Sequence, residues 1–283
     1  MKVIGIDMGG SGIKAGFYDS GTLLGRTRVP TLTDHGRAVI FSQIILAAKT
    51  LIDEYGPADA VGIVSSGDIS PDGVILRAFN LPSLEGFNLR EAMEQELGIP
   101  VKVENDAVGA LVGELANYPG EKNVTGLTFG TGVGSASLID GVMHHGGKYD
   151  YGHIVLIPGG EPCKCGQNGC SESYLSATAL KRFASETYGR PIKTLDFFAA
   201  CKRHDARAIK ILDDYMMLLN MLLARICADI HPDMIILGGG MMGSTDLIGP
   251  RLKPIPARIV FARGGNQSGI RGAAIIASKE LQK

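Results

Sequence analysis

The sequence predicts an α/β protein that consists of two related domains. A strand, a glycine-rich turn and two further strands open the chain, and the same order of parts returns about 121 residues later. Helical patterns and short buried strands follow each copy, as is typical of α/β domains. The length of 283 residues also suits two domains, because one domain usually takes about 100–200 residues. We therefore expect an internal duplication of one α/β unit.

The first copy is a β-meander followed by alternating helices and strands. One of its helices has clear ends, because Asn88 and Glu91 form a capping box and Gly98 supplies a stop. Glycine also dominates the first turn of the meander, where it allows positive φ and close approach of a ligand. The predicted strands cover residues 2–7, 13–19, 23–29, 61–65 and 101–104, and the predicted helices cover residues 35–55, 89–97 and 105–117.

The second copy repeats the meander and then becomes mostly helical. A glycine loop again separates its first two strands, and His231-Pro232 ends its longest helix. The predicted strands cover residues 124–129, 135–139, 142–144, 234–237 and 258–261, and the predicted helices cover residues 172–188, 195–203, 206–230 and 268–283.

These elements predict a domain boundary near residue 117. The N-terminal α/β domain is expected to cover residues 1–117, with the C-terminal helix at about 268–283 packing back onto it. The second α/β domain is expected to cover residues 118–267. Two glycine turns that faced each other across a cleft between the domains would hold a polyphosphate from both sides through backbone N–H groups.

Composition excludes several classes of function. The chain has 28 Lys and Arg against 29 Asp and Glu, so it lacks the surplus of basic residues that a nucleic-acid or anionic-membrane partner requires. The most apolar segment, residues 215–230, is too short for a bilayer span. Five cysteines, an odd number, do not suggest a secreted disulfide framework. We expect a cytoplasmic protein with neither a nucleic-acid nor a membrane partner.

Two motifs carry acidic side chains at strand ends. Asp7 precedes the first glycine turn, which lies in a hairpin and therefore differs from the strand-to-helix phosphate loops. Beside phosphate-binding amides, its carboxylate suits a hydrated Mg²⁺ ion.

Asp106 lies where a buried strand gives way to a helix. It is either a helix cap and nothing more, or a general base that takes the proton of an alcohol attacking phosphorus.

The strongest pattern is a set of three cysteines and a histidine. Cys163, Cys165 and Cys170 follow His153 at spacings that suit a tetrahedral structural Zn²⁺ site. The alternative is three unpaired thiols near glycines. With four protein ligands the zinc ion would not activate water, and it would instead stiffen residues 159–173 and orient His153.

These motifs together resemble the ROK family (repressor, open reading frame, kinase), over essentially the whole length. The similar segments are the first glycine turn at residues 7–12, Glu104-Asn105-Asp106-Ala107, the second glycine loop at residues 128–134, Gly152-His153 with the cysteine motif at 163–172, and Ile236-Leu237-Gly238-Gly239-Gly240. The resemblance implies a duplicated actin/hexokinase-like (ribonuclease H-like) fold, ATP-dependent phosphorylation of a glucose-like hexose or an N-acetyl-hexosamine, and commonly a homodimer.

The resemblance also implies roles for individual residues. Asp106 would be the catalytic base, and the metal ligands would be His153, Cys163, Cys165 and Cys170. The sugar hydroxyls would be held by Asn80, Asn105, Asp150, His153 and Glu172. ATP and Mg²⁺ would be held by Asp7, Gly9, Gly10, Ser11, Gly12 and Lys14, by Gly130, Thr131, Gly132, Val133 and Gly134, and at the adenosine by Gly238, Gly239 and Gly240.

The chain departs from the family pattern at three places where the sugar would bind. Ser66-Gly67 replaces the usual Pro-Gly, Asp150 replaces the usual Glu, and a short insertion at residues 82–85 precedes Gly86-Phe87. All three departures bear on which sugar is used and leave the kinase interpretation intact.

Three other functions remain as alternatives. A polyphosphate-dependent glucokinase would share the glycine loops, but those enzymes tend to lack the cysteine cluster, and residues 238–240 favour adenosine. A sugar-sensing repressor of the family would carry a DNA-binding segment before the first glycine loop, which here begins at Asp7. A zinc-ribbon binding module would explain neither the duplicated hairpins nor Asp106.

Overall fold

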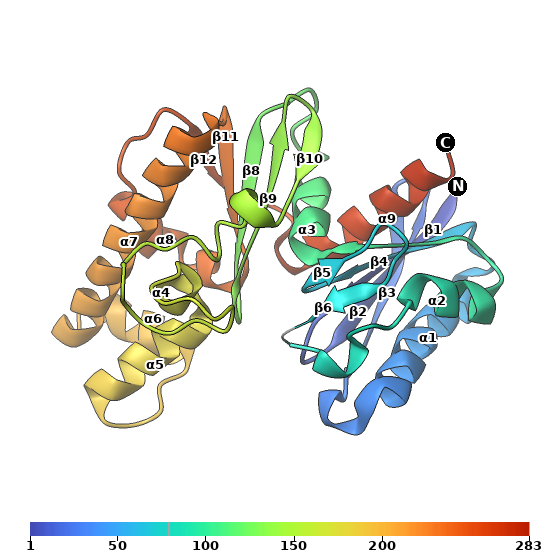
Figure 1. Cartoon of the computed structure of the whole chain (residues 1–283), viewed down its shortest axis with the longest axis horizontal. Helices are drawn as coiled ribbons and strands as arrows, with labels where there is room; N and C mark the ends of the chain where they lie inside the picture. The colour runs from blue at the N-terminus through green and yellow to red at the C-terminus, as the bar shows by residue number, and fades with distance from the viewer. Residues whose placement is uncertain (79, 283) are drawn as a thin grey trace. The chain divides into compact units, whose positions relative to one another are not determined.

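The computed structural model describes residues 1–78 and 80–282, and the chain forms two compact units (Figure 1). The first unit combines Met1–Pro119 with Asn266–Lys283, and the second is Gly120–Gly265. Each unit contains one mixed five-stranded sheet, and the two sheets have the same pattern of strand connections. The predicted duplicated α/β fold is therefore confirmed.

The sheet of the first unit has the strand order β3-β2-β1-β4-β7. β1, β2 and β3 form the antiparallel meander, and β1, β4 and β7 run parallel to one another. The glycine turn therefore joins two strands of the meander, while three parallel strands end together at one edge. The strands are β1 (Lys2–Met8), β2 (Ile13–Asp19), β3 (Thr22–Val29), β4 (Ala60–Ser65) and β7 (Val101–Asn105), with a separate short hairpin of β5 (Asp68–Ile69) and β6 (Ile75–Arg77).

Helices cover both faces of this sheet (Figure 1). Ile4, Ile6 and Met8 of β1 point toward α1, with which they form one hydrophobic core. Val3 points to the opposite face, where it packs with Ala274 and its neighbours on α9. This alternation follows from the two-residue period of a strand. The helices are α1 (Gly36–Tyr55), α2 (Leu89–Leu97), α3 (Asp106–Leu115) and α9 (Ser268–Glu280), and short 3₁₀ turns lie at Thr33–His35, Pro82–Leu84 and Gly265–Gln267.

The closest helix packing in this unit joins α3 to α9. A side chain at Gly272 of α9 would overlap the carbonyl oxygen of Gly109 on α3, and one at Gly113 would overlap the carbonyl oxygen of Ser268. The glycines therefore allow the two backbones to touch. This contact ties the C-terminal helix to the rest of the first unit and places the N-terminus of α9 beside α3.

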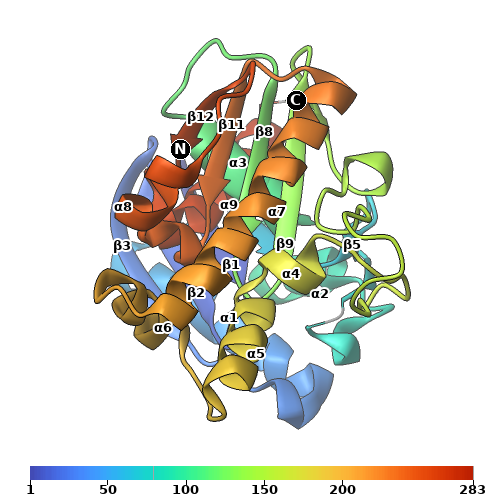
Figure 2. The same cartoon turned by 90° about the vertical axis from the view of Figure 1, so that its left-hand side faces the viewer.

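The sheet of the second unit has the order β10-β9-β8-β11-β12. Its meander and its parallel strands repeat those of the first unit. In Figure 2 the long helix α7 runs along this unit. Leu222 and Ile226 on its buried side belong to the same hydrophobic core as Leu127 and Leu237 of the sheet. The strands are β8 (Val124–Phe129), β9 (Val133–Ile139), β10 (Val142–His144), β11 (Met234–Gly238) and β12 (Arg258–Phe261).

The prediction of one helix over residues 172–188 is wrong, because this segment forms two helices. Ser176 interrupts it in an extended conformation, and its side chain accepts a hydrogen bond from the Ala179 N–H as the N-cap of the second helix. The helices are α4 (Glu172–Leu175), α5 (Ala177–Tyr188), α6 (Thr194–Lys202), α7 (Ala206–Ile230) and α8 (Thr245–Ile248), with 3₁₀ turns at Gly147–Tyr149, Gly240–Gly243 and Gly249–Arg251.

Within residues 1–78 and 80–282, no helix combines the length and the apolar character that crossing a membrane requires. The apolar segment at 215–230 belongs to α7, and only its buried side is packed in the core of the second unit.

The glycine contact between α3 and α9 predicts a large cost for a small substitution. Gly272→Ala should lower the free energy of unfolding by about 3 kcal/mol, because the new methyl group meets backbone rather than a movable side chain. Gly243→Ala is the control, since its φ is not positive and its methyl group would meet no atom of the described residues within 4 Å beyond its chain neighbours. Urea unfolding measures both, and equal losses would contradict the role given to the contact.

Candidate functional site

The candidate site of the first unit lies at the carboxyl ends of its parallel strands. Met8, Ser65 and Asn105 form the last paired row of β1, β4 and β7. The chain leaves the sheet here toward the first glycine turn on one side and toward α3 on the other. In open α/β sheets, this edge is where ligands bind.

The first glycine turn presents backbone N–H groups. Its ends are closed by a hydrogen bond from the Gly9 N–H to the Gly12 carbonyl at 3.1 Å, and the Thr31 hydroxyl donates to the Gly9 carbonyl. The amides of Gly10, Ser11 and Gly12 make no hydrogen bond to any residue that the structure describes. Asn80 lies beside the turn, because a side chain at Gly10 would come within 3.8 Å of the Asn80 carbonyl oxygen.

Asp7 is held beside this turn by two features. Lys14 Nζ donates to Asp7 Oδ2 at 3.1 Å. The carboxylate also packs against Gly269 in the first turn of α9, where a side chain would lie 2.9 Å from Asp7 Oδ2. The positive end of the helix dipole favours a carboxylate at this position.

Asn105, and not Asp106, is the cap of α3. The Asn105 side-chain oxygen accepts hydrogen bonds from the N–H groups of Ala107 at 2.9 Å and Val108 at 3.3 Å. Its amide nitrogen donates to the Gly67 carbonyl oxygen at 2.9 Å. The N-cap position considered for Asp106 is therefore taken by Asn105. Asp106 is the first residue of the helix, one position beyond its cap.

The environment of Asp106 makes it a weaker acid than usual. Burial raises the pKa of the Asp106 carboxyl from 3.8 to about 6, and the neighbouring negative charge of Asp7 acts in the same direction. Hydrogen bonds from the backbone at Ala107 and at Asp106 itself oppose the shift without cancelling it. A carboxylate with a pKa near 6 is ionised at neutral pH and is basic enough to accept a proton in a reaction.

In the second unit the glycine loop is shorter than predicted. β9 begins at Val133, so only Gly130, Thr131 and Gly132 lie in the loop. Glu172 Oε2 accepts a hydrogen bond from the Val133 N–H at 2.9 Å. A side chain at Gly132 would overlap this carboxylate, so glycine there leaves room for the Glu172 contact. The sequence predicts Glu172 as a sugar ligand and gives no sign of this contact.

The glycines predicted to hold adenosine lie next to this loop. Gly238 is the last residue of β11 and pairs with Thr128 of β8. Gly239 has a positive φ of 89° and packs against the backbone of Phe129, which immediately precedes Gly130. The second glycine loop and residues 238–240 therefore lie next to each other in the second unit.

Three of the predicted sugar ligands are brought together in the second unit. The His153 N–H donates to the Asp150 carbonyl at 3.0 Å, and the Glu172 N–H donates to the Gly152 carbonyl at 2.9 Å. Ser135 of β9 fixes this segment to the sheet, since its hydroxyl donates to the Tyr149 carbonyl and accepts from the Tyr151 N–H. The other two, Asn80 and Asn105, belong to the first unit with the predicted base, Asp106.

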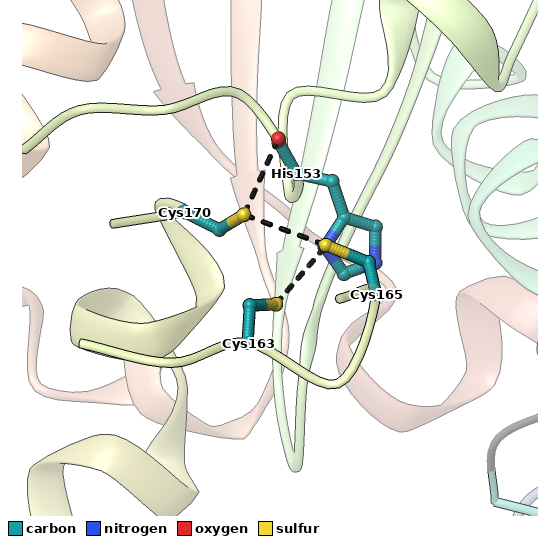
Figure 3. A group of neighbouring side chains, drawn as sticks. All are labelled: His153, Cys163, Cys165 and Cys170. Carbon is teal, nitrogen blue, oxygen red and sulfur yellow. Dashed lines mark hydrogen bonds between the residues drawn. The ribbon is translucent and has the colours of Figure 1, made fainter. Parts of the chain in front are cut away.

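The predicted metal ligands converge in the second unit (Figure 3). The ligand atoms of His153, Cys163, Cys165 and Cys170 all lie within 4.8 Å of one another. Cys163 Sγ is 3.5 Å from His153 Nδ1, and Cys165 Sγ is 3.5 Å from Cys170 Sγ. A tetrahedral ion with Zn–S bonds of about 2.3 Å would separate its sulfur ligands by about 3.8 Å, so the four residues fit such an ion.

Two of the three thiols of this cluster are hard to ionise without a nearby cation. Burial raises the pKa of both the Cys163 and Cys170 thiols. A buried thiolate is therefore costly unless a positive charge lies beside it, and a coordinated metal ion supplies that charge. All five cysteines of the chain are free, and none of the cluster is in a disulfide.

Two residues of the site were missed by sequence reasoning. Thr31 anchors the first glycine turn, and Ser135 anchors the segment of Asp150 and His153. Both act through a hydroxyl that reaches a backbone carbonyl far along the chain, and no local pattern in the sequence indicates such a contact. The Ser66 hydroxyl at the carboxyl edge is buried and has no partner among the described residues.

Comparison with known proteins identifies the family. The model of the ROK family matches residues 3–280. The chain belongs to the ROK family. Among its relatives, a glucokinase of Halalkalibacterium halodurans is 30% identical over 98% of this chain and 95% of its own length. An N-acetyl-D-glucosamine kinase of Escherichia fergusonii is 31% identical, over 96% and 98% of the two chains.

A solved ROK structure has the same fold. The ROK glucokinase of Streptomyces griseus, in complex with glucose and AMPPNP, superposes with a TM-score of 0.86 at 28% identity, covering 99% of this chain and all of the other. The family assignment made from the motifs is thus confirmed over nearly the whole length.

The raised pKa of Asp106 predicts that this residue destabilises the protein at neutral pH. A carboxyl whose pKa is higher in the folded state lowers stability increasingly as the pH rises from the unfolded pKa to the folded pKa, and the cost is complete above the folded pKa and absent below the unfolded one. Asp106→Asn should raise the free energy of unfolding at pH 7 by up to ~3 kcal/mol, the equivalent of about two pKa units.

Urea unfolding between pH 3.5 and 8 measures this effect, with Asp53→Asn on the exposed side of α1 as the control. The gain from Asp106→Asn should shrink as the pH falls through 6 toward 4. A substitution that destabilises the protein at pH 7, or whose effect does not vary with pH, would contradict the electrostatic account.

Proposed function

We propose that the chain is an ATP-dependent sugar kinase that phosphorylates a hydroxyl of a glucose-like hexose or an N-acetyl-hexosamine. The observation that carries the proposal is Asp106, a partly buried carboxylate at the carboxyl edge of the sheet whose pKa is raised to about 6. The glucokinase and N-acetyl-D-glucosamine kinase relatives support this substrate class.

In the proposed reaction Asp106 accepts the proton of the sugar hydroxyl as its oxygen attacks the γ-phosphorus of ATP. A new bond forms between that oxygen and phosphorus, and the bond from phosphorus to the β–γ bridging oxygen breaks, so ADP leaves. The amides of Gly10, Ser11 and Gly12 suit the phosphate oxygens, because each is an N–H without a protein acceptor among the described residues. Asp7 would hold a hydrated Mg²⁺, which neutralises charge on the phosphates when it is bound.

The remaining polar residues are proposed to bind the sugar and the nucleotide. Asn105 can offer its second amide hydrogen, since its oxygen and its first hydrogen are used within the protein. The other proposed sugar ligands are Asn80, Asp150, His153 and Glu172, and adenosine is proposed to lie against Gly238, Gly239 and Gly240, beside the second glycine loop of Gly130, Thr131, Gly132, Val133 and Gly134.

We propose that the metal of the cysteine cluster is Zn²⁺. Three thiolates and one imidazole are ligands that zinc prefers, and four protein ligands leave no position for a reactive water. The metal's role would be structural: the same segment carries His153 and leads to Glu172, so fixing it fixes two proposed sugar ligands.

The chain is further proposed to work in the cytoplasm as a homodimer whose small-molecule partners are the sugar and ATP. Five free cysteines suit a reducing compartment. Sedimentation equilibrium of the purified protein tests the dimer, and a single species of monomer mass would contradict it.

Asp106→Asn tests the proposed reaction. The substitution keeps the size of the side chain, and α3 keeps its cap because Asn105 supplies it. We expect kcat to fall by about 10²–10⁴-fold while sugar affinity changes little, because the lost interaction forms only as the hydroxyl gives up its proton. In the wild type, kcat/KM should rise with pH through about 6 and then level off, since the base works deprotonated.

A coupled kinase assay against glucose, mannose, N-acetylglucosamine and N-acetylmannosamine provides the best substrate for these measurements. Sugar binding by calorimetry shows that the variant is folded. A variant that keeps more than about a tenth of the wild-type kcat would contradict the role of Asp106.

Metal analysis tests the zinc proposal. Protein purified without added zinc should contain about one equivalent of zinc per chain, and Cys170→Ser should lose it. Cys201→Ala is the matched control, because Cys201 is another buried cysteine, on α6, that lies outside the cluster. The Cys170 variant should also bind sugar more weakly while its KM for ATP changes less. A wild-type protein that is folded and active without metal would contradict the proposal.

A further inference from the structure

One row across the sheet of the first unit places three charged residues side by side. Asp7 of β1 pairs with Lys14 of β2, and Lys14 pairs with Arg28 of β3. Residues paired in this way project from the same face of the sheet, which is the face that α9 covers at Asp7. The row therefore carries one negative and two positive charges, and the two positive charges are direct neighbours.

This row carries a net positive charge in the described part of the protein. Like charges that lie directly opposite each other on neighbouring strands repel. Asp7 neutralises Lys14 through the contact of 3.1 Å, whereas Arg28 has no carboxylate within ion-pair distance among the described residues. The row therefore keeps one positive charge that no carboxylate of the described residues neutralises, and that charge lies beside the first glycine turn.

The Arg28 side chain is also turned toward the first glycine turn. A side chain at Gly12 would lie 2.9 Å from Arg28 Nε and 3.1 Å from Nη2. The guanidinium group therefore rests directly on the backbone of Gly12, one residue from Ser11, whose amide has no acceptor among the described residues. A glycine at position 12 leaves room for this contact.

We propose that Arg28 is a phosphate-binding residue of the donor site and that, with Lys14 and the amides of the glycine turn, it grips the phosphate chain of the donor. Guanidinium groups bind phosphate oxygens in a bidentate manner. The recognised chemistry is a chain of phosphates, which a nucleoside triphosphate and an inorganic polyphosphate share. The inference rests on the proposed function for its role in catalysis, but the binding of phosphate does not depend on any turnover.

Arg28→Gln tests the inference, with Arg26→Gln as a matched control. Arg26 lies two residues earlier on β3, so it projects from the same face, but it pairs with Gly16 and not with the charged row. Calorimetry with inorganic tripolyphosphate and with ATP measures binding without sugar. Arg28→Gln should weaken the binding of tripolyphosphate and of ATP about 10- to 100-fold, because a hydrogen bond to a charged group is lost. Arg28→Lys should restore part of the loss, and Arg26→Gln should remain within about twofold of the wild type.

Kinetics separate this inference from the proposed function. With the best sugar, Arg28→Gln should raise the KM for ATP and leave the KM for the sugar unchanged. Equal effects of Arg28→Gln and Arg26→Gln, or a wild type that binds neither tripolyphosphate nor ATP, would overturn the inference. Tripolyphosphate binding that depends on Arg28 in a protein that phosphorylates no sugar would uphold it and contradict the proposed function alone.

Discussion

The candidate site of the first unit depends on the hydrogen bonds of one side chain, that of Asn105. Its oxygen caps α3 and its nitrogen holds the Gly67 carbonyl, so it joins the end of β7, the start of the helix and the segment after β4. Because Asn105 takes the capping role, the adjacent Asp106 is left to face the carboxyl edge as the first residue of the helix. The sheet fixes this geometry, since the last row of β1, β4 and β7 ends at the same level.

The same edge is built at a cost to stability. Asp7 and Asp106 are acids close enough for the charge of one to raise the pKa of the other, and Lys14 and Arg28 are cations paired across two strands. Such local conflicts with the fold's stability are expected at functional sites and rarely elsewhere. A donor phosphate chain would place negative charge beside Lys14 and Arg28 and so relieve the repulsion between the cations. A sugar hydroxyl would donate a hydrogen bond to Asp106 and so relieve the repulsion between the acids.

The duplicated fold and the ROK family were predictable from the sequence because their signals are local. Glycine turns between alternating strands and the spacing of Cys163, Cys165 and Cys170 appear in short segments, and the convergence of these thiols on His153 follows from that spacing. The break at Ser176 was not predictable, because one extended residue within a helical pattern leaves the apolar spacing unchanged. The contacts that set the charge and position of the site residues join distant segments, as Arg28 does with Gly12, and no pattern along the chain records them.

The central claim is that burial beside Asp7 makes Asp106 a base that titrates near neutral pH. The most direct measurement is the pH titration of the Asp106 carboxyl carbon by NMR, in the protein without ligands, with the signal assigned from its absence in Asp106→Asn. The account predicts a pKa of about 6. A pKa near 4, roughly the ordinary value for an aspartate in water, would contradict it.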